Sequence, residues 1–271
     1  MRRPSQGIPT TRYGTLGGSQ TPRDGIASSK ARRVPTRSLS GAVVATPTTA
    51  PAGPSRTVVH GDALGWLREQ GVLGGASVVT SLPDLSEIPA LGFDGWRRWF
   101  EDAAAAVMGA VSDDGVAIFF QSDIRHAGLW VDKGALCQRA AEVSGMKLLF
   151  HKIVCRKPAG TVTYGRASYA HLLGFARHLR PAVQRSTADV LPDGGFMPGN
   201  KSMGVAACLD ACRFVVRQTK TRTIVDPFCG WGTVLAVANA MGLDAVGVDL
   251  SARMCRRAMD LKIDISSNFL L

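Results

Sequence analysis

The stretch Ile224-Val225-Asp226-Pro227-Phe228-Cys229-Gly230-Trp231-Gly232-Thr233 has the pattern of a buried strand that ends in an acid, then a turn with two glycines, then a helix. Gly230 and Gly232 allow a tight turn and let a ligand approach the backbone closely. The start of the following helix presents free N–H groups to an electron-rich ligand. The stretch therefore predicts a nucleotide-type binding turn in an α/β fold.

The residues in and near this turn restrict the kind of ligand that it can bind. The turn is not G-x-G-x-x-G, and no Lys-Ser/Thr follows the glycines as in a phosphate-binding P-loop. The carboxylate of Asp226 suits a ligand with a positive sulfonium and a free amino group better than a pyrophosphate. Asp249 ends the next predicted strand, where nucleotide-type folds accept hydrogen bonds from ribose hydroxyls.

The letters D-P-F-C-G-W-G-T resemble the D-P-F-x-G-x-G-T motif of S-adenosylmethionine-dependent amino-methyltransferases, which methylate exocyclic nitrogens of adenine and cytosine in nucleic acids. The resemblance implies S-adenosyl-L-methionine as cofactor and a Rossmann-like, seven-stranded class I α/β sheet. It implies that the turn lines the methionine end of the cofactor and that Asp249 holds the ribose. The expected cofactor-binding residues are Asp62, Asp226, Pro227, Phe228, Cys229, Gly230, Gly232, Thr233 and Asp249.

A second motif lies upstream, where Thr80-Ser81-Leu82-Pro83-Asp84 resembles the T-S-P-P-Y catalytic loop of the permuted members of this family. Ser81 and Pro83 match, Leu82 replaces a proline, and Asp84 replaces the aromatic residue that stacks on the extruded base. A carboxylate cannot stack, but it can accept a hydrogen bond or a proton. We expect Ser81 and the Leu82 carbonyl to orient the nucleophile beside Asp84. The target is then an exocyclic amine, a ring nitrogen or a base held differently; the other interpretation is a strand-end turn without chemistry.

Because the catalytic loop precedes the cofactor turn, the resemblance implies a circularly permuted domain over residues 57–271. His60-Gly61-Asp62-Ala63 resembles the segment before the catalytic strand in permuted members, which places Asp62 near the cofactor adenine. Apolar runs alternate with helical patterns, which predicts a parallel sheet covered on both faces. The expected strands are 57–60, 76–81, 115–121, 147–156, 172–177, 223–226 and 245–249. The expected helices are 63–70, 93–111, 133–144, 202–218, 233–241 and one capped by Ser251.

Residues 1–56 have a different composition from the rest of the chain. They hold nine Lys/Arg and one acid, a net charge of +8 out of +11, and seven of the 14 prolines. Such a segment buries too little apolar surface to fold. Its Arg-rich, Ser/Thr-rich and nearly acid-free composition is typical of an organellar transit peptide, with the mitochondrion favoured over the plastid. The alternative is a disordered basic tail on a cytoplasmic protein.

A second basic region lies inside the predicted domain. No Asp or Glu occurs between Ser144 and Ala188, whereas cations and aromatic residues do. Such clusters suit phosphate contacts and base stacking. The expected nucleic-acid contacts are Lys152, Arg156, Lys157, Tyr164, Arg166, Arg177 and Arg180.

These features predict a methyltransferase that acts on nucleic acid. Only 181–201 separates the last predicted strand before the cofactor turn from the following helix, which leaves little protein to read DNA grooves. RNA, as rRNA, tRNA or a ribosomal particle, is therefore the expected target. A DNA N4/N6 methyltransferase and an inactive RNA-binding or ribosome-assembly factor of the same fold remain alternatives.

Metal and membrane partners are not expected. The six cysteines form no C-x-x-C pair, and the five histidines are scattered along the chain, so none is interpreted as a metal ligand. No apolar run approaches the roughly 18 residues that a transmembrane helix needs.

Overall fold

In a computed structural model, residues 53–266 are described. The predicted basic tail or transit peptide, 1–56, lies almost wholly outside this part and stays a prediction. The strands are β1 (Arg56–His60), β2 (Ala76–Thr80), β3 (Ala117–Gln121), β4 (Ile124–His126), β5 (Leu129–Val131), β6 (Lys147–Cys155), β7 (Tyr169–Ala176), β8 (Val190–Leu191), β9 (Thr223–Asp226) and β10 (Asp244–Asp249). The helices are α1 (Ala63–Gln70), α2 (Gly92–Ala110), α3 (Lys133–Val143), α4 (Val205–Gln218), α5 (Thr233–Ala240) and α6 (Ala252–Asp260), with short 3₁₀ turns η1 (Pro89–Leu91) and η2 (Val183–Arg185).

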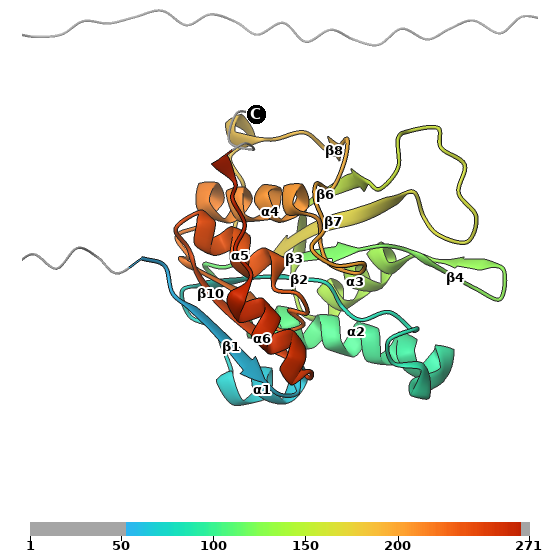
Figure 1. Ribbon diagram of the computed structural model, residues 1–271, viewed down its shortest axis with the longest axis horizontal. Coiled ribbons are helices and arrows are strands. Elements are labelled where there is room, and N and C mark those ends of the chain that lie inside the picture. Colours follow the sequence, from blue (N-terminus) through green and yellow to red (C-terminus); the bar gives the residue numbers. More distant parts are fainter. Residues whose placement is uncertain (1–52, 267–271) are drawn as a thin grey trace, which may run out of the picture. The chain divides into compact units, whose positions relative to one another are not determined.

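Eight strands form one sheet in the order β1-β10-β9-β2-β3-β7-β6-β8, as Figure 1 shows in part. Strands β1, β10, β9, β2 and β3 are parallel, and β7 runs antiparallel to both of its neighbours. The expectation of a purely parallel sheet was therefore wrong for β7. The two-residue strand β8 at the sheet edge is an addition to the seven strands expected.

Helices cover both faces of the sheet and enclose two cores. Helices α4, α5 and α6 pack on one face, around Leu209, Leu235 and Ala258. Helices α1, α2 and α3 pack on the other, around Trp96, Phe100 and Leu136. The central strands β2, β3, β7 and β9 are buried on both faces, which explains their largely apolar sequences. No helix among residues 53–266 is long and apolar enough to cross a bilayer.

The strand order reverses between β9 and β2, which are parallel neighbours. From β9 the chain passes through α5 to β10 on one side, and from β2 it passes through α2 to β3 on the other. Ligands of open α/β sheets bind at such a switch point, outside the carboxyl ends of the strands. The predicted cofactor turn and the predicted catalytic loop follow these two strands, so the fold brings them together.

The predicted and the observed elements differ at several points, including the start of β1, the start of α4 and the segment between β3 and α3. Strand β1 begins at Arg56, whose neighbour Ser55 also binds Asp244 of β10. Helix α4 begins at Val205, because Ser202 is held in a turn by hydrogen bonds with Gly199. The β4–β5 hairpin between β3 and α3 was not predicted; it is too short for a clear alternation of polar and apolar residues.

Candidate active site

Asp226 joins the two motifs. Its side chain is buried at the end of β9, and Oδ1 accepts hydrogen bonds from Thr80 Oγ1 at 2.7 Å and from the Phe228 backbone N–H at 3.1 Å. Thr80 ends β2 and directly precedes the catalytic loop. Burial raises the pKa of the Asp226 carboxyl to about 7, against the two hydrogen bonds, which lower it. The carboxylate thus favours a cationic ligand that would restore its charge.

The two glycines of the cofactor turn have different roles. Both have left-handed backbones, with φ of 49° at Gly230 and 73° at Gly232. A Cβ at Gly230 would meet no atom within 4 Å, so the space beside its backbone is open. A Cβ at Gly232 would lie 2.6 Å from the Cβ of Ala258, so this glycine lets α6 pack against the turn.

The remaining residues of the cofactor turn are buried or pack against neighbouring side chains. Pro227 and Cys229 are buried, and the Cys229 N–H donates to the Val248 carbonyl at 2.9 Å. Phe228 meets the ring of Trp99 edge-on, with 6.0 Å between centroids. Thr233 is buried at the start of α5, and its Oγ1 has no hydrogen-bond partner.

Asp249 and Asp62 lie at the ends of the neighbouring strands, as expected. Asp249 accepts hydrogen bonds from the Gly230 N–H at 3.0 Å and the Ser251 N–H at 2.7 Å. Asp62 caps α1 by accepting from the Gly65 N–H at 2.6 Å. Within residues 53–266, no Lys or Arg forms an ion pair with either acid or with Asp226. The cofactor side of the site is therefore acidic without internal compensation.

These features fit S-adenosylmethionine. The ligand carries an ammonium and a sulfonium, which suit the uncompensated acid Asp226, and ribose hydroxyls, which could donate hydrogen bonds to Asp249. The open space at Gly230 and the unpartnered hydroxyl of Thr233 give it room and a hydrogen-bond partner. The residues present therefore fit the group.

The predicted catalytic loop, 80–84, is held in place at its middle residues. Leu82 is 3% exposed, and Pro83 accepts a hydrogen bond from Trp96 Nε1 at 3.1 Å. Asp84, at the end of the loop, accepts a hydrogen bond from the ammonium of Lys133. The side chain of Lys133 is 3% exposed and that of Asp84 is 34% exposed, so the pair bridges the core and the surface.

Lys133 is a site residue that the sequence did not reveal. It opens α3 directly after the N-cap residue Asp132 and has no motif around it. A lysine at the start of a helix is normally solvated, so nothing in the sequence indicated that its ammonium reaches the catalytic loop. Only the packing of α3 beside α2 brings Lys133 to Asp84.

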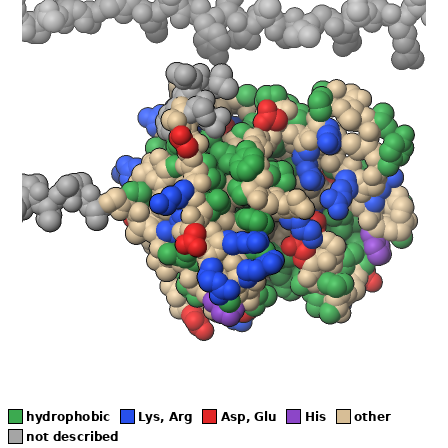
Figure 2. Space-filling model, in the orientation of Figure 1, with side chains coloured by type: hydrophobic (Ala, Val, Ile, Leu, Met, Phe, Trp, Pro, Cys, Tyr) green, Lys and Arg blue, Asp and Glu red, His purple; other side chains and the backbone are tan. Residues whose placement is uncertain are grey.

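A cavity of about 1020 Å³ opens beside the catalytic loop. Ser81, Leu82 and Asp84 line it, whereas no residue of the cofactor turn does. Its cationic or histidine lining residues are Arg125, His126, Lys133, Arg156, Lys157, Arg166 and Lys201. On the visible face, Lys and Arg side chains gather where Figure 1 places the β4 hairpin and the loop before β7 (Figure 2). The cavity thus offers space for a substrate beside a cationic surface.

The structure divides the predicted nucleic-acid residues into two groups. Arg156, Lys157 and Arg166 line the cavity, and Tyr164 stands between two residues that line it. The three remaining residues do not line the cavity. Lys152 is buried and bound to Asp210, Arg177 donates to the Val111 and Met108 carbonyls, and Arg180 donates to the Leu179 carbonyl.

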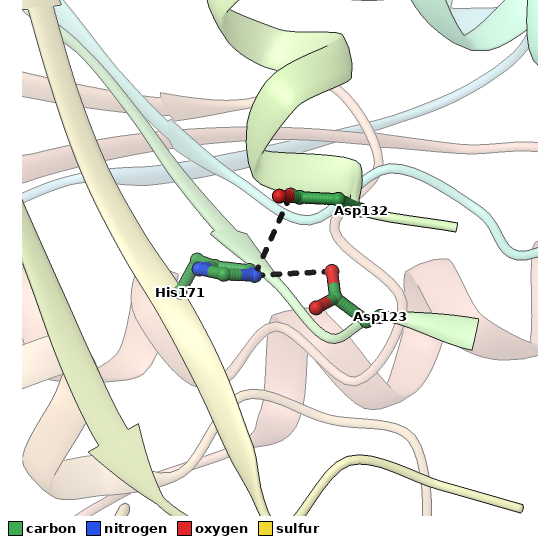
Figure 3. Close-up of side chains that lie close together, drawn as sticks. All are labelled: Asp123, Asp132 and His171. Atoms are coloured by element: carbon green, nitrogen blue, oxygen red, sulfur yellow. Dashed lines mark hydrogen bonds and ion pairs between the residues drawn. The ribbon is translucent and has the colours of Figure 1, made fainter. Parts of the chain in front are cut away.

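Two histidines that are distant in sequence come together beside the cavity. Strands β6 and β7 pair antiparallel, which places His151 Nε2 2.8 Å from His171 Nδ1. His171 Nε2 in turn lies 3.0 Å from Asp123 Oδ1 and 3.9 Å from Asp132 Oδ1 (Figure 3). These two histidines are thus scattered in the sequence but lie in contact in the fold.

This cluster has the composition of a metal site, because one atom from each of Asp123, Asp132 and His171 lies within 4.8 Å of the others. Hydrogen bonds already engage these atoms. Asp123 also accepts from the Lys133 N–H and the Tyr169 hydroxyl, and Asp132 accepts from the Ala135 N–H. Burial raises the pKa of the Asp123 carboxyl, but the hydrogen bonds from His171, Lys133 and Tyr169 outweigh it and lower this pKa. The expectation that no residue binds a metal stays a prediction.

Comparisons with known proteins address the fold. No family model matches the chain, and no curated protein matches it significantly. Solved structures do match. A protein assigned as a DNA modification methylase from Thermus thermophilus, complexed with S-adenosyl-L-methionine, has a TM-score of 0.56 and 20% identity, over 75% of this chain and 91% of that chain.

Two further solved structures agree with the first. The cytosine-N4-specific PvuII DNA methyltransferase has a TM-score of 0.59 and 14% identity, over 80% of this chain and 90% of that one. M1.HpyAVI, solved as a complex with SAM, has a TM-score of 0.51 and 13% identity, over 76% of this chain and 100% of that one. This chain has the methyltransferase fold. The Rossmann-like sheet and its permuted order, which the resemblance implied, are therefore confirmed.

Proposed function

We propose that this methyltransferase-fold chain is an enzyme that transfers a methyl group from S-adenosylmethionine to a base of a nucleic acid. The observation that carries the proposal is the 2.7 Å hydrogen bond from Thr80 Oγ1 to Asp226 Oδ1. It ties the acid of the cofactor turn to the first residue of the catalytic-loop motif at the switch point. A cofactor bound at the turn and a substrate bound in the cavity would then lie next to each other, on either side of this hydrogen bond.

On the cofactor side, Asp226 would receive the ammonium of S-adenosylmethionine, and Asp249 would receive the ribose. The cofactor supplies an electrophilic methyl group on its sulfonium. The chain's own contribution is to bind and orient, because positioning accounts for much of the acceleration of a two-reactant step. Phe228 and the space beside Gly230 would shape the pocket around the methyl donor.

On the substrate side, Ser81 and the Leu82 carbonyl line the cavity and would orient the attacking nitrogen. Asp84 would accept a hydrogen bond or a proton from the base. The Lys133 ammonium fixes the Asp84 carboxylate in place, so this acid is held at a defined position rather than left free. That arrangement differs from a stacking aromatic residue and favours recognition of an N–H group on the base edge.

DNA and RNA are both candidate substrates. The matching solved structures include DNA methyltransferases, and this supports DNA as the first candidate substrate. RNA remains the second candidate, because the chain between β7 and α4 holds only the short elements η2 and β8 and no groove-reading domain. An organellar location for the RNA reaction would depend on residues 1–56 acting as a transit peptide.

The experiment is methyl transfer from S-adenosylmethionine with a labelled methyl group, using the full chain and total DNA or total RNA as separate substrates. Nucleoside mass spectrometry then identifies the methylated base. We expect label in one nucleic acid and its loss in Asp84→Ala. Label in neither, together with no measurable binding of the cofactor, would overturn the proposal.

An inactive nucleic-acid-binding protein of the same fold is the second candidate function. The observation that favours it is Asp84 at the position of the family's stacking aromatic residue. Binding of S-adenosylmethionine and of nucleic acid without methyl transfer to either substrate would select this candidate.

A further inference from the structure

The β4–β5 hairpin lies outside the eight-stranded sheet. It follows β3 at the carboxyl edge, and its two strands form a small second sheet that is separate from the main one. Its turn residues Ala127 and Gly128 both have positive φ, 47° and 79°, as in a type I′ turn. Alanine is strained in that conformation, and such strain tends to persist where function maintains it.

The hairpin is fixed to the body of the protein beside its turn, through His126, and at its base, through Ile124. The ring of His126 stacks on Phe93 of α2, with centroids 4.0 Å apart and planes at 5°. Ile124 forms an antiparallel bridge with Arg166 in the loop 156–168, which connects β6 to β7. The hairpin and this loop therefore form one rim, which we call the hairpin rim, and Figure 1 shows them side by side.

The hairpin rim exposes two aromatic rings, Trp130 and Tyr164, that belong to neither hydrophobic core. Trp130 is 51% exposed and carries the Arg125 guanidinium 4.6 Å from its ring centroid. Tyr164 is 93% exposed, between Thr163 and Gly165, both of which line the cavity. Large exposed aromatic residues beside a cavity indicate a binding surface, because they offer flat faces at little entropic cost.

The charge of the rim is not balanced within the protein. Among residues 53–266, no carboxylate forms an ion pair with Arg125, Arg156, Lys157 or Arg166. Three of the four acids that line the same cavity are engaged by other side chains, Asp84 by Lys133, Glu87 by Lys201 and Asp123 by His171. The fourth, Asp193, accepts a hydrogen bond from the Gly195 N–H. The rim thus presents four uncompensated cations together with two exposed rings.

We propose that the hairpin rim binds unpaired nucleotides next to the target base, with Trp130 and Tyr164 stacking on bases and the four cations contacting phosphates. Stacking platforms combined with backbone cations are the general means of holding single strands, since every base has a π face. A paired duplex hides those faces. The substrate of the proposed methyl transfer, on which this inference rests for its biological role, is accordingly unpaired around the target.

The test measures equilibrium binding by the full chain without cofactor. The probes are labelled oligothymidylate and oligouridylate of about twelve nucleotides, and the duplex of the first with oligodeoxyadenylate. We expect tighter binding of the single strands than of the duplex. Trp130→Ala and Tyr164→Ala should each weaken single-strand binding by roughly fivefold to a hundredfold. Val143→Ala, at an 86% exposed position that ends α3, is the control and should change nothing.

A salt titration tests the cations separately. For single strands, the slope of log K against log salt should fall by roughly 0.7 for each phosphate that Arg125→Ala or Lys157→Ala no longer neutralises. Melting curves verify that each variant folds. Equal affinity for single strand and duplex, or unchanged binding in both aromatic variants, would overturn the inference.

The two proposals fail separately. If the chain methylates nucleic acid while Trp130→Ala and Tyr164→Ala bind normally, the enzyme stands and the rim does not. If methyl transfer is absent but the aromatic variants lose single-strand binding, the rim stands and the enzyme does not.

Discussion

At the scale of single residues, Asp226 makes the site sensitive to pH. Its folded pKa of about 7 lies above the unfolded value of roughly 3.9. The folded state therefore holds a proton that the unfolded state loses. The stability linked to this proton is fully present below about pH 4 and is lost as the pH rises through about 7.

We expect the free energy of unfolding of the natural chain, relative to that of Asp226→Asn, to fall between about pH 4 and about pH 7. Urea unfolding at several pH values measures this difference, and the histidines cancel because both proteins carry them. A difference that does not change with pH would contradict the raised pKa.

The Asp84–Lys133 pair should contribute to the free energy of unfolding. Removing one partner of a buried pair leaves the other charge uncompensated, at a cost of about 3–5 kcal/mol when both are buried. Because Asp84 is 34% exposed and Lys133 is 3% exposed, Asp84→Ala should cost more than Lys133→Met. We expect about 3 and about 1.5 kcal/mol respectively.

The double variant Asp84→Ala, Lys133→Met is the control for this pair, and it should be more stable than Asp84→Ala alone. Thermal or urea unfolding gives the four values of the cycle. Additive losses would mean that the two side chains do not interact. Methyl transfer is expected to be lost in both single variants and to stay lost in the double one.

At the scale of elements, the cofactor turn depends on the approach of α6. Gly232→Ala adds a Cβ 2.6 Å from Ala258, whereas Gly230→Ala adds one in open space. Both substitutions place alanine in a left-handed backbone, which costs about 1–2 kcal/mol. We expect Gly232→Ala to be clearly less stable in urea than Gly230→Ala, because α6 must also shift. Equal stabilities would mean that α6 does not constrain the turn.

The sequence predicted these elements well where their apolar runs are continuous, as in β2 and β9. It placed β7 three residues late, because Tyr169, Ala170 and His171 do not form an apolar run by themselves. These residues belong to β7 because β6 pairs with them, including Cys155 with Tyr169. The β4–β5 hairpin was missed for a similar reason, since its stability comes from contacts with α2 and the loop 156–168.

At the scale of the whole molecule, Arg56 ties the first strand of the described part to its last helix. Its guanidinium donates to Asn239 Oδ1 at 2.7 Å and to the carbonyls of Ala258 and Leu261 at 2.8 and 2.7 Å. The carbonyls at the end of α6 have no partner within the helix, so a cation is favourable there. In a permuted fold this contact takes the place of a chain connection between α6 and β1.

We expect Arg56→Met to lower the free energy of unfolding by about 1.5–3 kcal/mol, through the loss of charged hydrogen bonds. Arg56→Lys should lose less, because its ammonium keeps the charge but not the planar fork. Arg97→Met is a suitable control, since Arg97 forms only a 3.9 Å surface pair with Glu101 and should matter by about 0.5 kcal/mol or less. A loss in Arg56→Met no larger than in this control would contradict the role of Arg56.

By itself the sequence determined the apolar strands around the switch point and the two motifs, because glycine turns, strand-end acids and apolar runs act locally and leave a pattern in neighbouring residues. The permuted order followed from the resemblance of these motifs to a known family. The tertiary structure alone decided which distant side chains meet. Lys133 reaches Asp84, His151 reaches His171, and Lys152 turns inward to Asp210 rather than toward solvent. Such contacts depend on strand register and helix packing. Many residues together determine these, so no single position in the sequence reveals them.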